Sequence, residues 1–147
     1  MARSPKGGLK VAGADIGPLP PPHLRELVRL AEKVLRAELP KTPGSVNLVF
    51  CDNAYMRDLN RRFRNLDKAT DVLSFIYEEE NEEGDVFGEI YIATLKAQKQ
   101  APRWKNSFFD ELRRLVVHGA LHLAGMDHMN ARDRKAMRIR EDFYLKP

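Results

Sequence analysis

The stretch HGALHLAGMDH, residues 118–128, carries three of the chain's four histidines and sets the arrangement of the segments around it. On a helix, His118 and His122 lie one turn plus a step apart, so both imidazoles leave the same face and can bind one ion. Gly125 is free to adopt the left-handed backbone that ends a helix, and the resulting turn directs His128 back toward the first two. The spacing therefore predicts a three-histidine metal site at a helix end.

For each of these histidines, the alternative is a hydrogen-bonded core residue, which is the commoner role of a single histidine on an apolar helix. Three histidines at chelating spacing favour the metal site. Three neutral imidazoles leave a fourth position of the ion open, as in catalytic rather than structural sites. We expect one Zn²⁺, although nickel or another divalent ion would accept the same ligands. Asp127 either orients a ligand imidazole or caps the loop.

The histidine spacing resembles that of the metzincin zinc proteases. In those proteases the residue after the first histidine is a glutamate that activates the attacking water, and this chain has Gly119 in that place. The metal site remains the favoured interpretation, but an ordinary peptidase becomes less favoured.

The helix that carries the histidines is apolar almost all round over residues 115–123, so it should be buried centrally. Ser107, with Asp110 three residues later, is expected to cap its N-terminus. Asn130 is expected to cap a last helix of mixed charge, packed onto the domain by Ala136, Met137, Ile139, Phe143 and Tyr144.

Upstream, apolar periodicity and turn residues predict the remaining elements. They are a short strand near residues 9–14 in a mostly irregular lead-in (1–22), a helix at 23–39, a strand at 46–51, a helix capped by Asp52, strands at 71–77 and 86–92, and a short helix capped by Thr94 and ended by Pro102. An antiparallel hairpin is the simplest pairing for the last two strands. The acidic block between them, residues 78–85, is expected to be a mobile loop.

Length and composition indicate one soluble domain. The chain has 147 residues, 43% of them hydrophobic and 31% charged, which suits a single globular domain with its own core. One cysteine, Cys51, excludes an intrachain disulfide. We expect a cytoplasmic protein without membrane contact, because no run of eighteen apolar residues occurs and the first residues lack the apolar core of a secretory signal.

The charge is unevenly distributed along the chain. The net charge is +4, and without the six acidic side chains of residues 78–85 the rest of the chain carries +10. Clustered arginine and lysine attract phosphate backbones. Composition alone leaves nucleic-acid binding and a solvated surface of mixed charge equally favoured.

Four segments together resemble the bacterial YbeY family of ribosomal RNA maturation endoribonucleases: LNRRFR at residues 59–64, TDVLSF at 70–75, FGEI at 87–90 and the histidine stretch. The resemblance covers about residues 46–128. It implies a compact α+β domain in which a small mixed sheet packs against several helices. It also implies a metal held by His118, His122 and His128, and single-strand RNA cleavage in small-subunit 3′-end maturation and ribosome quality control.

The same resemblance implies catalytic roles for Arg64 and His118, since an arginine before the basic turn is functionally important in that family. A guanidinium near the metal could hold a phosphate by two parallel hydrogen bonds and stabilise the charge of the transition state. Without the resemblance, a solvent-facing charge at a helix end would be favoured. Two positions depart from the family. Met126 replaces an aromatic residue and is expected to pack the turn, whereas Glu89 replaces an aspartate and has no assigned role.

Three functions compete on these observations. The first is an endoribonuclease that uses water or the RNA 2′-hydroxyl as nucleophile, with single-stranded ribosomal RNA and the ribosome or small-subunit proteins as partners. The second is a metzincin-like metallopeptidase, and the third is a non-catalytic ribosome-assembly factor that a metal stabilises. The sequence indicates no oligomeric state.

Overall fold

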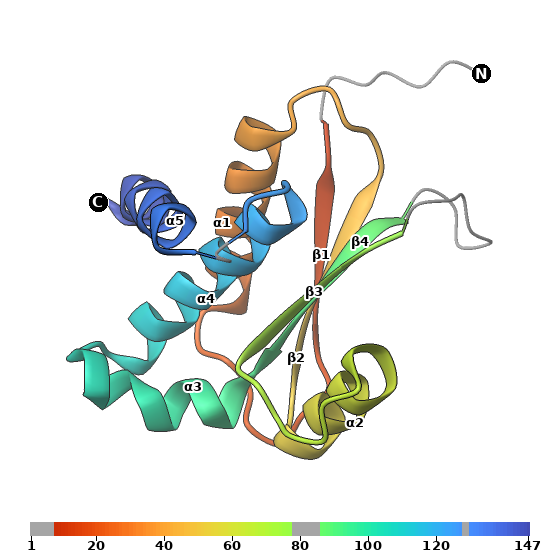
Figure 1. Cartoon of the computed structure of the whole chain (residues 1–147), viewed down its shortest axis with the longest axis vertical. Helices are drawn as coiled ribbons and strands as arrows, with labels where there is room; N and C mark the ends of the chain where they lie inside the picture. The colour runs from red at the N-terminus through yellow and green to blue at the C-terminus, as the bar shows by residue number, and fades with distance from the viewer. Residues whose placement is uncertain (1–7, 78–85, 128–129) are drawn as a thin grey trace.

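The computed structural model describes residues 8–77, 86–127 and 130–147 (Figure 1). In chain order, the described elements are β1 (Lys10–Asp15), α1 (Leu24–Glu38), β2 (Ser45–Cys51), α2 (Asn53–Arg64), β3 (Val72–Ile76), β4 (Val86–Ala93), α3 (Thr94–Gln100), the short 3-10 helix η2 (Ala101–Trp104), α4 (Phe108–Leu123) and α5 (Ala131–Leu145). The acidic block predicted as a mobile loop lies outside the described residues. No helix among those described is both long and apolar enough to cross a membrane.

The strands form one mixed sheet in the order β1-β2-β4-β3. β1 pairs parallel with β2 and β2 pairs parallel with β4, whereas β3 pairs antiparallel with β4. The predicted hairpin of β3 and β4 is therefore confirmed. The lead-in is less irregular than predicted, because residues 10–15 form a full edge strand of the sheet. α1 joins the parallel strands β1 and β2, as such a connection requires.

Helices cover both faces of the sheet, as Figure 1 shows. Side chains alternate between the faces of a strand, so β2 and β4 contribute to two cores. Phe50, Ile90 and Ile92 pack with α1, α4 and α5 in the larger core, while Tyr91 and Cys51 pack with α2 in the smaller one. α4 lies in the middle of the larger core, as predicted for the histidine-bearing helix.

Both ends of α4 form as the sequence predicts. The Ser107 side chain accepts a hydrogen bond from the Asp110 backbone at 3.0 Å. At the other end Gly125 has a φ of 100°, and the backbone N–H groups of Gly125 and Met126 donate to the carbonyls of His122 and Leu121. These two bonds close the last helical turn, and only glycine adopts such a φ without strain.

The capping predictions elsewhere are confirmed in two of three cases. The Asp52 carboxylate accepts from the Tyr55 backbone at 2.8 Å, and the Asn130 side chain accepts from the Asp133 backbone at 2.9 Å. Thr94 was wrongly predicted as a cap. It is the first residue of α3, inside the helix, and its buried hydroxyl makes no hydrogen bond to a described residue.

α5 packs through a different face than predicted. Met137 and Tyr144 are buried as expected, but Ile139 and Phe143 are 61% and 60% exposed. The third buried residue of the inward stripe is Glu141. A carboxylate at that place breaks the apolar pattern, which is why hydropathy selected the wrong neighbours.

Candidate active site

His118 and His122 bring their imidazoles together on one face of α4. Their Nε2 atoms are 3.1 Å apart, and the ring centroids are 4.7 Å apart at an interplanar angle of 75°. Two nitrogens bound to tetrahedral zinc at about 2.0–2.1 Å would be roughly 3.4 Å apart. The two imidazoles therefore need to move only slightly apart to bind such an ion. His128 lies outside the described residues, and those described contain no group of three or more His, Cys, Asp or Glu able to hold a metal. The three-ligand set stays a prediction.

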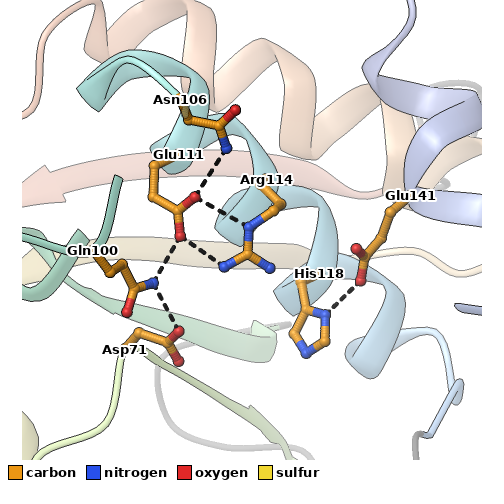
Figure 2. Close-up of polar contacts among 7 residues, drawn as sticks. All are labelled: Asp71, Gln100, Asn106, Glu111, Arg114, His118 and Glu141. Carbon is orange, nitrogen blue, oxygen red and sulfur yellow. Dashed lines mark hydrogen bonds and ion pairs between the residues drawn. The ribbon is translucent and has the colours of Figure 1, made fainter. Parts of the chain in front are cut away.

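Glu141 fixes the orientation of the first imidazole from the neighbouring helix (Figure 2). Its Oε2 lies 2.5 Å from His118 Nδ1, and its side chain is largely buried. The carboxylate accepts the Nδ1 proton, so the Nε2 lone pair of His118 is directed toward His122. Carboxylate partners of this kind usually accompany metal-binding histidines. No local sequence pattern marks Glu141, because the contact joins residues 23 positions apart.

A cleft of about 890 Å³ opens beside the two imidazoles. Its walls are the end of α2, the loop that follows, β3 and the end of α4. The predicted residues Arg64 and Asp127 line it together with His118 and His122. Lys68 and Asp71, from the loop between α2 and β3, also line it. The structure thus gathers four of the residues selected from sequence around one space.

Arg64 is the last residue of α2 and is held against β3. Asn65, which follows it, has a φ of 58° and turns the chain away from the helix. The Arg64 Nη2 donates to the Ser74 carbonyl at 3.2 Å, and its guanidinium carbon lies 5.5 Å from the centre of the Phe75 ring. Within the described chain no carboxylate pairs with Arg64. Its charge therefore remains available at the cleft wall.

The other three arginines of α2 are ion-paired. Arg57 contacts Asp67 at 2.7 Å, while Arg61 and Arg62 contact Asp58 at 2.6 and 3.3 Å. Hydrogen bonds from Arg62 and Arg61 lower the pKa of Asp58, and the hydrogen bond from Arg57 lowers the pKa of Asp67. Both aspartates are thus ionised at neutral pH. Arg64 therefore differs from the other arginines of α2, whose charges are engaged in ion pairs.

Ser74 connects the arginine to the histidine helix. Its carbonyl accepts from Arg64, and its hydroxyl donates to the Gly119 carbonyl at 2.9 Å. α4 approaches the sheet closely here, since a Cβ on Gly119 would lie 2.7 Å from Ile90 Cγ2 and 3.2 Å from Val72 Cγ2. A glutamate at this position would collide with the sheet. The metzincin base is therefore excluded by packing as well as by residue type.

A buried polar network is centred on Glu111, two helical turns before His118 (Figure 2). Glu111 is fully buried and accepts hydrogen bonds from Arg114 at 2.6 and 3.1 Å, Gln100 at 2.7 Å and Asn106 at 3.2 Å. Burial would raise the pKa of Glu111, but these bonds together hold it below its usual range. Gln100 also donates to Asp71 at 3.0 Å. Through Gln100 of α3 and Glu111 of α4, the network holds the Asp71 carboxylate in place at the cleft wall.

Glu89, whose role the sequence left open, belongs to the opposite face of the sheet. Its carboxylate accepts from the hydroxyls of Tyr77 and Tyr91, each at 2.7 Å, and from the Asn47 amide at 3.2 Å. Burial, followed by the hydrogen bond to Glu89, raises the pKa of Tyr91. Glu89 does not line the cleft. Met126, the other departure, packs at the edge of the larger core as predicted.

The paired imidazoles, the carboxylate behind one of them and the arginine of the same cleft define a small α+β protein with a histidine site beside a cationic side chain. The family model described as Endoribonuclease YbeY matches residues 21–147. The chain therefore belongs to the endoribonuclease YbeY family, as its sequence motifs indicated.

Individual relatives agree with this assignment. Endoribonuclease YbeY of Desulforamulus reducens is 42% identical over 129 residues, covering 81% of this chain and 84% of the relative. The Pelotomaculum thermopropionicum protein of the same name is 41% identical over 124 residues, covering 81% of this chain and 82% of the relative. The solution structure of TM1509 from Thermotoga maritima matches with a TM-score of 0.60 and 29% identity, covering 92% of this chain and 86% of that one.

Proposed function

We propose that this protein is a metal-dependent endoribonuclease that cleaves single-stranded ribosomal RNA. The observation that carries the proposal is the meeting of two facing imidazole nitrogens and an arginine without a carboxylate partner among the described residues, in one cleft. A phosphodiester needs a cationic partner for its oxygens, and the family relatives are named as endoribonucleases.

His118, His122 and His128 would hold the ion, which we expect to be Zn²⁺, with nickel or another divalent ion as the alternative. When bound, the ion would polarise a phosphoryl oxygen. Glu141 keeps the His118 ring in the tautomer that presents Nε2. Arg64 would bind the oxygens of the same phosphate, and its bond to Ser74 and its place over Phe75 restrict its side chain in advance.

The physiological substrate that we propose is the 3′ region of small-subunit ribosomal RNA, processed in the cytoplasm during ribosome maturation and quality control. The ribosome or small-subunit proteins would be the partners. The family resemblance supports this assignment, and the net charge of +4 suits a polyanionic substrate. Isolated protein is expected to be a weak nuclease, because the ribosome would position the RNA.

The proposal is tested by metal analysis of the purified protein and by cleavage of a single-stranded RNA with and without a chelator. We expect cleavage to stop on chelation and to return with Zn²⁺. A 2′,3′-cyclic phosphate on the product would identify the 2′-hydroxyl as nucleophile, and a 5′-phosphate on the downstream product would identify water. Cleavage that persists in His122→Ala would contradict the proposal. A folded His122→Ala protein that still supports ribosome maturation would instead favour the non-catalytic assembly factor.

A further inference from the structure

A second cavity, of about 440 Å³, lies on the other side of His118 between η2, α4 and α5. We propose that it binds a nucleotide of single-stranded RNA next to the scissile phosphate, with Trp104 stacking on the base and Arg138 binding a flanking phosphate. The choice of RNA as ligand rests on the proposed function. Apart from His118 and Glu141, the residues that line the cavity have no role in the proposed chemistry.

The cavity and the cleft are adjacent, because His118 lines both. Arg114 lines the cavity and His122 lines the cleft. These three residues are each four positions apart on α4, so they form one stripe with a rise of about 6 Å per step. A strand whose phosphate lies at the histidines would therefore extend into the cleft on one side and into the cavity on the other.

Trp104 provides the aromatic surface of the cavity. It is the only tryptophan of the chain, it ends η2, and it is 63% exposed. The guanidinium carbon of Arg114 lies 5.9 Å from the centre of its ring. A large aromatic ring exposed to this extent contributes little to the core. Exposed aromatic rings beside cations are the usual stacking surfaces for bases of single-stranded nucleic acids.

The charges of the cavity suit a nucleotide rather than an apolar ligand. Arg134 and Arg138 lie one turn apart on α5, and neither is ion-paired to any residue that the structure describes. Of the carboxylates on the walls, Glu141 is bonded to His118, which leaves Asp142, one turn after Arg138 on the same helix. The two free guanidinium groups therefore exceed the free carboxylates, and guanidinium groups bind phosphate oxygens in pairs of hydrogen bonds.

The single tryptophan allows binding to be measured without any cleavage. The full-length Zn²⁺-loaded protein is titrated with a 2′-O-methyl RNA of about ten nucleotides, within the usual site sizes for single strands. The integrity of the oligonucleotide is checked after each titration. We expect its binding to quench Trp104 fluorescence. In anisotropy titrations with the labelled oligonucleotide, Trp104→Ala should bind at least about fivefold more weakly and Trp104→Phe should retain most of the affinity.

Two exposed residues of α5 outside the cavity provide matched controls. Phe143→Ala removes an aromatic ring that is 60% exposed, and it should leave affinity unchanged. Arg138→Ala should weaken binding and lower the slope of log affinity against log salt by about one, whereas Arg132→Ala should change affinity much less. With cleavable RNA, Trp104→Ala should raise KM and leave the metal content unchanged.

The outcomes separate this inference from the proposed function. If the protein cleaves RNA, but fluorescence is unchanged on binding and Trp104→Ala behaves like Phe143→Ala, the cavity is not an RNA site and the proposed function stands. If the oligonucleotide quenches Trp104 and Trp104→Ala binds weakly, but no RNA is cleaved, the cavity assignment stands and the proposed function fails.

Discussion

Replacement of Glu141 by glutamine tests how α5 orients His118 for metal binding. The glutamine keeps the shape of the side chain and one acceptor oxygen, but it removes the negative charge that lies 2.5 Å from His118 Nδ1. A neutral acceptor makes a hydrogen bond about half as strong as a charged one. The amide group can also present its NH₂ to the ring, which would favour the tautomer with the proton on Nε2. Both effects oppose metal binding.

The size of the effect follows from the position of the carboxylate. Loss of a hydrogen-bonding partner behind a ligand histidine typically costs about 10- to 100-fold in metal affinity, which corresponds to roughly 1.4–2.7 kcal/mol. Glu141 is largely buried, so water replaces it poorly. We expect Glu141→Gln to weaken Zn²⁺ binding about tenfold and Glu141→Ala to weaken it by closer to a hundredfold.

The assay is competition for Zn²⁺ with a chromophoric chelator at neutral pH, paired with urea unfolding of the metal-free proteins. Glu38→Gln is the matched control, because the Glu38 carboxylate also binds α5, through Tyr144 and Arg140, but contacts no histidine. It should lower the free energy of unfolding and weaken Zn²⁺ binding much less than Glu141→Gln does, because it removes no group that contacts a histidine. The reasoning is refuted if Glu141→Gln binds Zn²⁺ within twofold of the wild type, or if Glu38→Gln weakens Zn²⁺ binding equally.

Three further predictions concern Arg64, Gly119 and Glu111. Arg64→Ala should keep its metal content and lose about a hundredfold or more in the rate of RNA cleavage, because it removes a cleft cation that pairs with no carboxylate of the described residues. Arg61→Ala, which removes an arginine paired with Asp58, should lose much less, and equal losses would remove Arg64 from the site. Gly119→Ala should lower the free energy of unfolding by roughly 1–2 kcal/mol, since the new Cβ would lie 2.7 Å from the methyl group of fully buried Ile90. Ala136→Gly at an exposed site of α5 calibrates helix propensity, and a stabilised Gly119→Ala protein would show that the contact relaxes freely. The pKa of Glu111 is lower in the folded than in the unfolded protein, so its contribution to stability is present above the unfolded pKa of about 4.3 and is lost as the pH falls through the folded value. In urea titrations between neutral and acidic pH, Glu111→Gln should therefore lose less stability on acidification than the wild type does, and equal losses would contradict this linkage.

The features that the sequence predicted well are those in which nearby residues determine the geometry. His118 and His122 share a helix face because of their spacing, and Gly125 ends that helix because of its conformational freedom. Ser107 and Asn130 cap helices through contacts three residues away. The arginine position followed from the family motif, and the structure adds that Arg64 pairs with no carboxylate of the described segments while the other arginines of α2 are ion-paired.

The features that the sequence missed depend on contacts between distant segments. Glu141 is one of many charged residues in α5, and only the docking of that helix onto α4 makes it the partner of His118. Similarly, Gln100 bonds to both Asp71 and Glu111, and these three residues come from different parts of the chain. Ile139 and Phe143 were selected by hydropathy, yet they face outward because the inward stripe contains Glu141. A buried carboxylate that serves a site thus misleads a prediction based on apolar periodicity.

The polar attachment of α5 has a consequence for both cavities. Met137 and Tyr144 are its buried apolar residues, and two carboxylates complete its docking: Glu141 with His118, and Glu38 with Tyr144. Burial and the bond to Glu38 raise the pKa of Tyr144 to about 12, so its hydroxyl keeps its proton and donates throughout the neutral range.

The docked position of α5 is therefore required both for the orientation of His118 and for the arginine wall of the second cavity. A metal at the histidines and a nucleotide in that cavity would each favour this position. Two ligands that favour the same conformation increase each other's affinity, and the increase is equal in both directions. We therefore expect Zn²⁺ to tighten oligonucleotide binding by the same factor by which the oligonucleotide tightens Zn²⁺ binding. Charge attraction between the ion and a phosphate contributes to this factor in every variant. Glu38→Gln loosens α5 without contacting either ligand. The decrease of the factor in this variant therefore measures the part that depends on the docking of α5.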